Sequence, residues 1–172
     1  MNYTLRMKIL GVDPGLATIG LGTIETASSA SLRVCEWLTI KTPSGLPLPE
    51  RLCEIRRDLL AYLEETQPDL AVVERLFFAT NEKTAIDVAQ ARGVIVQCIA
   101  EKGVPLLEPT PLQLKRCITG DGSADKLQVQ TMLQRLLLLT EIPRPDDAAD
   151  ALALAVFGAL HQPKLDPGLT LA

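Results

Sequence analysis

The sequence predicts an α/β fold built on a mixed five-stranded sheet flanked by helices. Two short apolar runs, 8–13 and 70–74, each end in an acid and are too short for helices, so they are typical of buried strands. Alternating segments at 18–26 and 32–41 predict an antiparallel meander with the first run. Apolar residues at helical spacing in 49–66 predict a helix before the second run. This order of strand, helix and strand favours a parallel crossover that brings the second run beside the first.

The first strand is closed by its own turn chemistry. Pro14 follows Asp13 and stops strand pairing, and Gly15 supplies a turn. Asp13 is therefore expected at the C-terminal end of the strand, where open α/β sheets place their chemistry. In the next strand, Gly20 and Gly22 predict either a bulge or the close approach of another backbone.

The second half of the chain is mostly helical, with one further strand. The predicted elements are a loop at 76–80, a helix at 81–102, a strand at 104–107 and helices at 111–119, 124–139 and 146–161. Ser123 is expected to cap the helix that follows it, and Pro145 precedes the last helix. We expect residues 1–161 to form a single domain and 162–172 to be a loose tail.

The composition allows a sizeable core but is not typical of a nucleic-acid-binding protein. Of the 172 residues, 47% are hydrophobic and only 3% aromatic, so Leu, Val, Ile and Ala must build the core. The net charge of −4 argues mildly against a nucleic-acid partner, since Lys and Arg bind phosphate. Local charge decides binding more than the total does, so the objection is limited.

The chain has four cysteines: Cys35, Cys53, Cys98 and Cys117. No two have the C-x-x-C spacing of a zinc site, and we expect buried, reduced thiols. Asp13 and Pro14 interrupt the first apolar run, so no signal peptide is predicted. No run reaches membrane-spanning length, and a soluble, cytoplasmic protein is expected.

Four acids are expected where the strands and the last helix meet. Asp13 and Glu74 end the two parallel strands, and Asp147 and Asp150 share one face of the last helix. Taken alone, Asp13 is also explained as a turn cap, and the helical acids by their favourable place at a helix N-terminus. If the two strands and the last helix bring their acids together, the carboxylates repel one another, and this arrangement is harder to explain without a cation between them. Hard divalent metal ions take that role well.

Such a cluster supports metal-dependent hydrolysis of a phosphodiester. Four carboxylates can hold a pair of Mg²⁺ ions, of which one activates water and the other stabilises the leaving 3′ oxygen. No histidine base is required by this chemistry. The single histidine, His161, is expected at the surface.

Short motifs follow one another along residues 7–161 in a specific order and spacing. They are Gly11-Val12-Asp13-Pro14-Gly15, Val73-Glu74 with Phe77 and Asn81, Gln90-Ala91-Arg92-Gly93, Leu114-Lys115, Thr119-Gly120, Ala124 with Lys126, Gln128-Val129-Gln130 and Asp147-Ala148-Ala149-Asp150-Ala151-Leu152-Ala153. Each motif is weak alone. Together they resemble the RuvC family of Holliday-junction resolvases.

The resemblance implies an RNase H-like fold, a homodimer and paired nicking of four-way DNA junctions during recombination and repair. It implies that Asp13, Glu74, Asp147 and Asp150 are the metal-binding catalytic acids, with two Mg²⁺ ions in each site that Mn²⁺ can replace. It also implies a branch-migration motor complex of the RuvA and RuvB type as a partner.

The basic candidates for DNA contact are Arg75, Lys83, Arg92, Lys115 and Lys126. The last two match basic positions that the family uses near DNA; without the resemblance they would be solvated helix lysines. Lys83, Arg92 and Arg116 are weaker candidates for a phosphate track. Arg75 is expected either to steady the scissile phosphate or to pair with a neighbouring acid.

Phe77 is the aromatic candidate for DNA contact, because it follows Glu74 by three residues. We predict that its ring stacks on a base of an opened junction and so replaces a lost base stack. The family has an aromatic-bearing loop at this position. The alternative is that Phe77 and Phe78 pack under the helix that follows.

Three other functions compete with this prediction. An ATP-binding module of the actin and sugar-kinase type also has a phosphate loop after a strand ending in Asp, but 172 residues cannot hold its two domains. An RNase H-like nuclease of ribosomal RNA precursors would share the acids. A non-catalytic junction-binding protein would share the fold, but the complete set of acids disfavours it.

Overall fold

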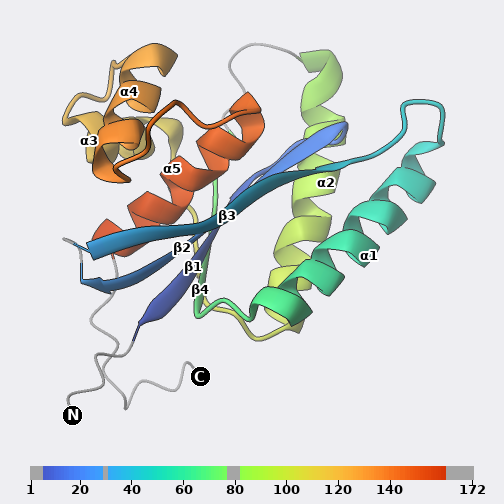
Figure 1. The fold of residues 1–172 in the computed structure, drawn as a ribbon. Coiled ribbons are helices and arrows are strands. Elements are labelled where there is room, and N and C mark those ends of the chain that lie inside the picture. The colour runs from blue at the N-terminus through green and yellow to red at the C-terminus, as the bar shows by residue number, and fades with distance from the viewer. Residues whose placement is uncertain (1–5, 29–30, 77–81, 162–172) are drawn as a thin grey trace.

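The computed structural model describes residues 6–28, 31–76 and 82–161, and they form a sheet covered by helices on both faces. The predicted tail and Phe77 lie outside these residues. The sheet has five strands in the order β3-β2-β1-β4-β5. Figure 1 shows α1 and α2 together on one side of the sheet, with α5, α3 and α4 on the other.

The strands confirm the predicted mixed sheet. β1 (Met7–Asp13) pairs antiparallel with β2 (Thr18–Ser28), which pairs with β3 (Ser31–Lys41). β4 (Leu70–Val73) lies on the other side of β1 and runs parallel to it, and the short β5 (Leu106–Leu107) extends the parallel half. The crossover through α1 (Leu48–Thr66) therefore brings β4 beside β1 as the sequence predicts.

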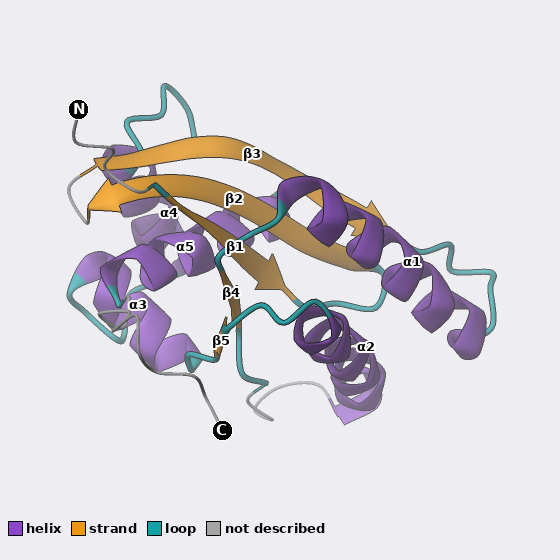
Figure 2. Ribbon diagram, turned by 90° about the horizontal axis from the view of Figure 1, so that it is seen from below, coloured by secondary structure: helices purple, strands orange, loops and turns teal. Residues whose placement is uncertain are grey.

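Two apolar cores form because successive side chains of a strand point to opposite faces. Leu10 and Val12 pack with α1 and with α2 (Glu82–Glu101), whereas Ile9 packs with α5 (Asp146–Leu160). In β4 the same alternation turns Ala71 and Val73 toward α1 and α2. Figure 2 shows the sheet lying between these helical layers.

α5 packs directly against β1 and β2 because both surfaces lack large side chains at the contact. A Cβ added to Gly20 would lie 1.9 Å from the backbone oxygen of Asp147, and one added to Gly11 would lie 1.9 Å from that of Ala151. Ala148, Ala151 and Ala155 of α5 lie at this contact and are almost fully buried, and Gly22 leaves room for the backbone of Leu152. The predicted close approach at Gly20 is thus confirmed, and the bulge between β2 and β3 lies further along, between Thr23 and Ile24.

The prediction that Ser123 caps a helix at 124–139 is wrong. Ser123 donates from its backbone and its hydroxyl group to the carboxylate of Asp121, so it belongs to the preceding turn. Asp125 caps α4 (Lys126–Leu136) instead, through a reciprocal pair of hydrogen bonds with Gln128. Thr110 caps α3 (Pro111–Thr119) in the same way.

The cysteines are free, as predicted, but they are not all buried. Cys98 is buried and Cys117 half-buried, whereas Cys35 lies exposed on the edge strand β3 and Cys53 on the solvent face of α1. His161 is exposed, as expected, and its ring stacks on Phe157. In the described part of the chain, every helix is too short or too polar to cross a bilayer.

Candidate active site

The parallel pair β1 and β4 places the first two acids side by side. Val12 pairs with Val73, so Asp13 and Glu74 each stand one residue further along adjacent strands. Alternation along each strand also directs both acids to the face covered by α5, the face that Ile9 occupies. The strand pattern alone therefore brings two carboxylates to one edge of the sheet.

α5 supplies the third carboxylate. The helix begins at Asp146, directly after Pro145, and its first turns cross the ends of β1 and β2. Asp150, Asp13 and Glu74 line one cavity of about 200 Å³ together with Lys115 of α3 and Lys126 of α4. Three acids distant in sequence thus share one cavity.

Asp147 lies beside this cavity and lines a neighbouring pocket with the loop after β1 and with Arg51. Its charge still reaches Asp13, whose pKa it raises along with other acids. The structure therefore brings three predicted acids together on one cavity and places the fourth at its border.

Burial and mutual repulsion raise the pKa values of Asp13, Glu74 and Asp150. Loss of solvent is the largest cause for Asp13 and Glu74, followed by the charge of Asp150, and the pKa of each rises to about 7. Burial also raises the pKa of Asp150, although Lys126 opposes that rise. Carboxylates held this way favour any cation that can enter among them.

Two lysines supply positive charge at the cavity. Lys126 Nζ lies 3.1 Å from Asp150 Oδ2 and 3.3 Å from Asp146 Oδ2. Desolvation lowers the pKa of Lys126, but its hydrogen bonds and ion pairs with these acids outweigh that loss, so its pKa is raised. The charge of Lys115 opposes part of the rise in the pKa of Glu74 that burial and Asp150 cause.

The donor set suits a hard divalent cation, because every acid offers oxygen ligands only. As the side chains stand, no group of three or more carboxylates, histidines or cysteines within residues 6–28, 31–76 and 82–161 is arranged to hold a metal ion. Lys126 takes up one oxygen of Asp150 in this arrangement. Metal binding at these residues therefore requires their side chains to rearrange.

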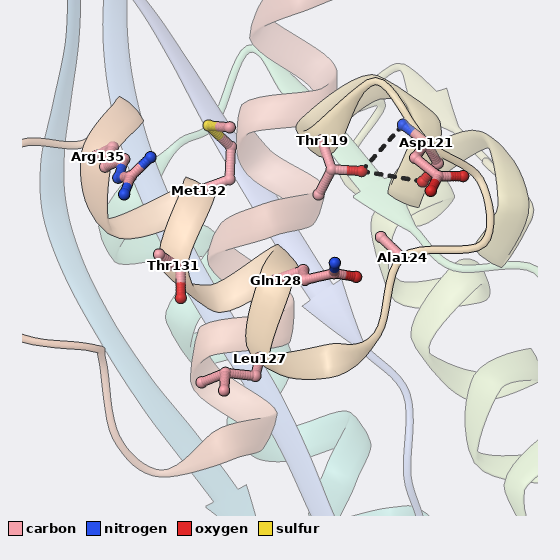
Figure 3. Close-up of a pocket in the computed structure, with 8 residues that line it drawn as sticks. All are labelled: Thr119, Asp121, Ala124, Leu127, Gln128, Thr131, Met132 and Arg135. Carbon is pink, nitrogen blue, oxygen red and sulfur yellow. Dashed lines mark hydrogen bonds between the residues drawn. The ribbon is translucent and has the colours of Figure 1, made fainter.

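A second pocket of about 390 Å³ lies where α3 and α4 meet, and Figure 3 shows its lining. Its polar side chains are Thr119, Asp121, Gln128, Thr131 and Arg135. None of the four predicted catalytic acids lines it. The chemistry of the acid cluster therefore belongs to the cavity at the strand ends.

Comparison with known proteins identifies the family. A family profile described as crossover junction endodeoxyribonuclease RuvC matches residues 9–158. The chain belongs to the RuvC family. The enzyme of that name from Syntrophomonas wolfei is 49% identical over 150 residues, covering 87% of each protein. That from Chloroflexus aurantiacus is 46% identical over 159 residues, covering 92% of this chain and 96% of the relative.

Solved structures confirm the RNase H-like fold. RuvC of T. thermophilus in complex with a Holliday junction substrate superposes with a TM-score of 0.83 at 34% identity, covering 90% of this chain and 93% of that one. The yeast mitochondrial Holliday junction resolvase Ydc2 has a TM-score of 0.66 at 13% identity, which supports the fold alone.

The other residues predicted to contact DNA have varied positions in this RuvC-family chain. Arg75 is exposed, directly after Glu74. Lys83 lies in the first turn of α2, and Phe77 falls outside the described residues. Arg92 is mostly buried and turned inward, where it donates to the backbone oxygen of Glu74.

The role of Glu108 was missed by sequence reasoning. Its carboxylate pairs with the guanidinium of Arg92, beside the cavity. No helical or strand spacing relates the two residues, because α2 and the segment after β5 meet only in the folded sheet. A charged residue next to a short apolar strand was the one available signal.

Proposed function

We propose that this protein is a Mg²⁺-dependent endonuclease that resolves four-way DNA junctions by paired phosphodiester hydrolysis during recombination and repair. The observation that carries the proposal is the convergence of Asp13, Glu74 and Asp150 on one cavity beside two lysines. The match to a crossover junction endodeoxyribonuclease profile over residues 9–158 supports the substrate class. A relative solved with a Holliday junction supports it further.

The carboxylates of Asp13, Glu74, Asp147 and Asp150 would hold the metal, in a two-ion arrangement that Mn²⁺ also satisfies. When bound, the metal supplies Lewis-acid stabilisation of the phosphate and makes a nearby water more acidic. Asp13, which pairs with Gly20 of β2, and Glu74, which directly follows β4, would orient the bound group. No protein base is needed beyond these oxygen ligands.

The two lysines would position the scissile phosphate. Lys126 is held by Asp150 and Asp146 while no phosphate is bound, and a DNA phosphate offers it an alternative partner. Lys115 stands across the cavity near Glu74. Arg75 and Lys83 would extend the phosphate contacts outside the cavity, and Phe77 would stack on an unpaired base.

The partners proposed for this chain follow from the family. A homodimer would present two such cavities to the two opposed strands of a junction, which paired nicking requires. A branch-migration motor of the RuvA and RuvB type would deliver the junction. We place the protein in the cytoplasm, where its exposed free thiols at Cys35 and Cys53 suit a reducing environment.

A nicking gel tests the proposal. A labelled four-way junction is incubated with the protein, with and without Mg²⁺, beside linear duplex and RNA hairpin controls. Symmetric nicks in the junction alone, only with metal, are expected. Glu74→Gln should abolish nicking and retain junction binding, since it removes a ligand and no positive charge.

Three outcomes would contradict the proposal. Cleavage of the RNA hairpin but not the junction would indicate an RNA nuclease. Junction binding without nicking, over a range of Mg²⁺ and Mn²⁺ concentrations, would indicate a binding protein. Full activity of Glu74→Gln would separate the acid cluster from catalysis.

A further inference from the structure

Arg92 is engaged by the protein rather than presented to solvent. Only 18% of its side chain is exposed. Its Nε donates to the backbone oxygen of Glu74 at 2.8 Å, and its Nη2 donates to the carboxylate of Glu108. A single planar guanidinium thus holds two acceptors from two segments.

Both segments carry parts of the catalytic cavity. Glu74 follows the last residue of β4, and Glu108 follows the last residue of β5. Two residues after Glu108, Thr110 caps α3, the helix that carries Lys115. The backbone N–H of Arg75 also donates to the carbonyl of Pro109 at 2.9 Å, so the same two segments are tied twice.

Glu74 depends on such ties because it lies past the end of its strand. The paired residues of β4 end at Val73 with β1 and at Val72 with β5. The peptide unit after Glu74 is therefore held by two contacts beyond the paired residues: the Arg75 N–H bonds to Pro109 on the β5 side, and Arg92 donates to the Glu74 carbonyl from the α2 side. An acid displaced by about 1 Å from its productive position can cost on the order of 10²-fold in rate.

We infer that Arg92 is a positioning residue that sets Glu74 and the start of α3, and that it is not a phosphate contact. The inference rests on the proposed junction nuclease activity. It replaces the sequence-based interpretation of Arg92 as part of a DNA track. Loss of Arg92 would leave the Glu108 carboxylate without its cation and the Glu74 carbonyl without this donor.

Single-turnover nicking at saturating junction concentration separates positioning from DNA contact. Arg92→Ala should lower the nicking rate about 30- to 100-fold, with junction affinity within about threefold of the parent and an unchanged salt slope. Arg92→Lys keeps the charge but cannot serve both acceptors in the fork geometry, so it should restore little of the rate. Arg56→Ala is the matched control, because Arg56 pairs with Glu101 between α1 and α2 without touching the cavity.

Glu108 gives a second route to the same answer. Glu108→Gln and Glu108→Ala should lower the rate, although either change removes a negative charge that would only hinder DNA binding. Arg92→Ala with Glu108→Ala should be no slower than Arg92→Ala alone, because both changes remove one shared contact. Rates are measured well below the melting temperature of each variant, which thermal unfolding supplies.

A flatter salt slope in Arg92→Ala, restored by Arg92→Lys together with the rate, would show a phosphate contact and overturn the inference. Normal nicking by Arg92→Ala and Glu108→Ala would also overturn it while leaving the nuclease proposal intact. A parent protein that never nicks the junction would overturn the proposed function, and the inference with it. Additive losses in the double variant would show that the two residues act separately.

Discussion

At the scale of single residues, the cavity brings carboxylates together where burial and mutual repulsion both disfavour their charged forms. Asp13 is the most affected group, since burial and then Asp150, Glu74 and Asp147 all raise its pKa. The positive charge of Lys126, which pairs with Asp150, offsets part of this repulsion. A metal cation bound among the carboxylates would offset more of this repulsion.

The raised pKa of Asp13 makes the stability of the metal-free protein depend on pH. Between its ordinary value of 3.8 and the folded value of about 7, the folded state binds more protons than the unfolded state, so stability falls as pH rises. Asp13→Asn lacks this charge and should be more stable than the parent at pH 8 by about 2–4 kcal/mol, with little difference at pH 4.

Urea unfolding in the presence of a chelator at pH 4, 6 and 8 measures this effect. Asp58→Asn is a control, because Asp58 lies far from the acids on α1 and pairs with Arg57. Equal pH profiles for the parent and Asp13→Asn would show that Asp13 titrates normally, and the charge cluster would then be much weaker than its geometry implies.

Phe77 poses a second question at this scale, because the structure does not describe it. If its ring stacks on a base, Phe77→Ala should slow nicking far more than it weakens junction binding, and Phe77→Trp should retain much of the rate. If the ring is buried instead, truncation should cost about 3–5 kcal/mol of stability. Thermal melting beside single-turnover nicking distinguishes the two, and a large melting loss with normal nicking would remove Phe77 from the mechanism.

At the scale of elements, the distance between α5 and the sheet decides where its acids lie. Glycines in β1 and β2 and alanines in α5 let the backbones of the helix and the strands approach closely. A larger residue in that contact would lift the first turn of α5, which carries Asp147, away from β2. Packing and the geometry of the acids are therefore coupled at this interface.

Gly20→Ala tests that coupling. The added methyl group would lie 1.9 Å from the backbone oxygen of Asp147, so the helix must move, at a cost of about 1–3 kcal/mol or more. Nicking should fall as well, because Asp147 moves with the backbone. Gly45→Ala is the matched control, since nothing lies within 4 Å of a Cβ added there. Equal melting temperatures for the two variants would mean that α5 accommodates the methyl group.

At the scale of the whole molecule, an acidic chain must bind a polyanion. The net charge is −4, so we propose that junction affinity comes from a small local field around Lys115 and Lys126. That field is partly cancelled by the acids of the same cavity. Metal binding would reduce this cancellation, which links DNA affinity to metal occupancy.

Lys115→Ala and Lys126→Ala should each weaken junction binding for all sequences and flatten the salt slope by about one unit. The measurement is junction affinity between low and moderate salt, in a calcium or metal-free buffer that prevents turnover. Lys102→Ala is a control, because Lys102 pairs with Glu64 at the opposite end of the sheet from the cavity. Unchanged slopes in both test variants would show that neither lysine touches phosphate.

Local pattern in the sequence determined most of the architecture. Short apolar runs, helical spacing and the Pro14-Gly15 turn predict each strand and helix, because the sheet and its covering helices follow hydrophobic periodicity. Two elements are shorter than predicted: the helix expected at 124–139 spans Lys126–Leu136, and the strand expected at 104–107 spans Leu106–Leu107. The order of these elements also predicts the parallel pairing of β1 with β4, and hence that Asp13 and Glu74 are neighbours. The sequence did not identify the helix cap correctly. Asp125 caps α4 because Gln128 completes a reciprocal pair of hydrogen bonds with it, whereas Ser123 donates to Asp121 instead.

Only the tertiary structure decided how the charged residues are partnered. Lysines and arginines look alike in sequence, yet Lys126 faces Asp150 while Arg92 turns inward to Glu74 and Glu108. Asp147 and Asp150 look equivalent on one helix face, yet Asp150 enters the cavity and Asp147 lies at its border. The physical reason is that long polar side chains find their partners on elements that meet only on folding. Apolar periodicity is instead a local property of the sequence, so it predicts helices and strands without knowledge of the fold.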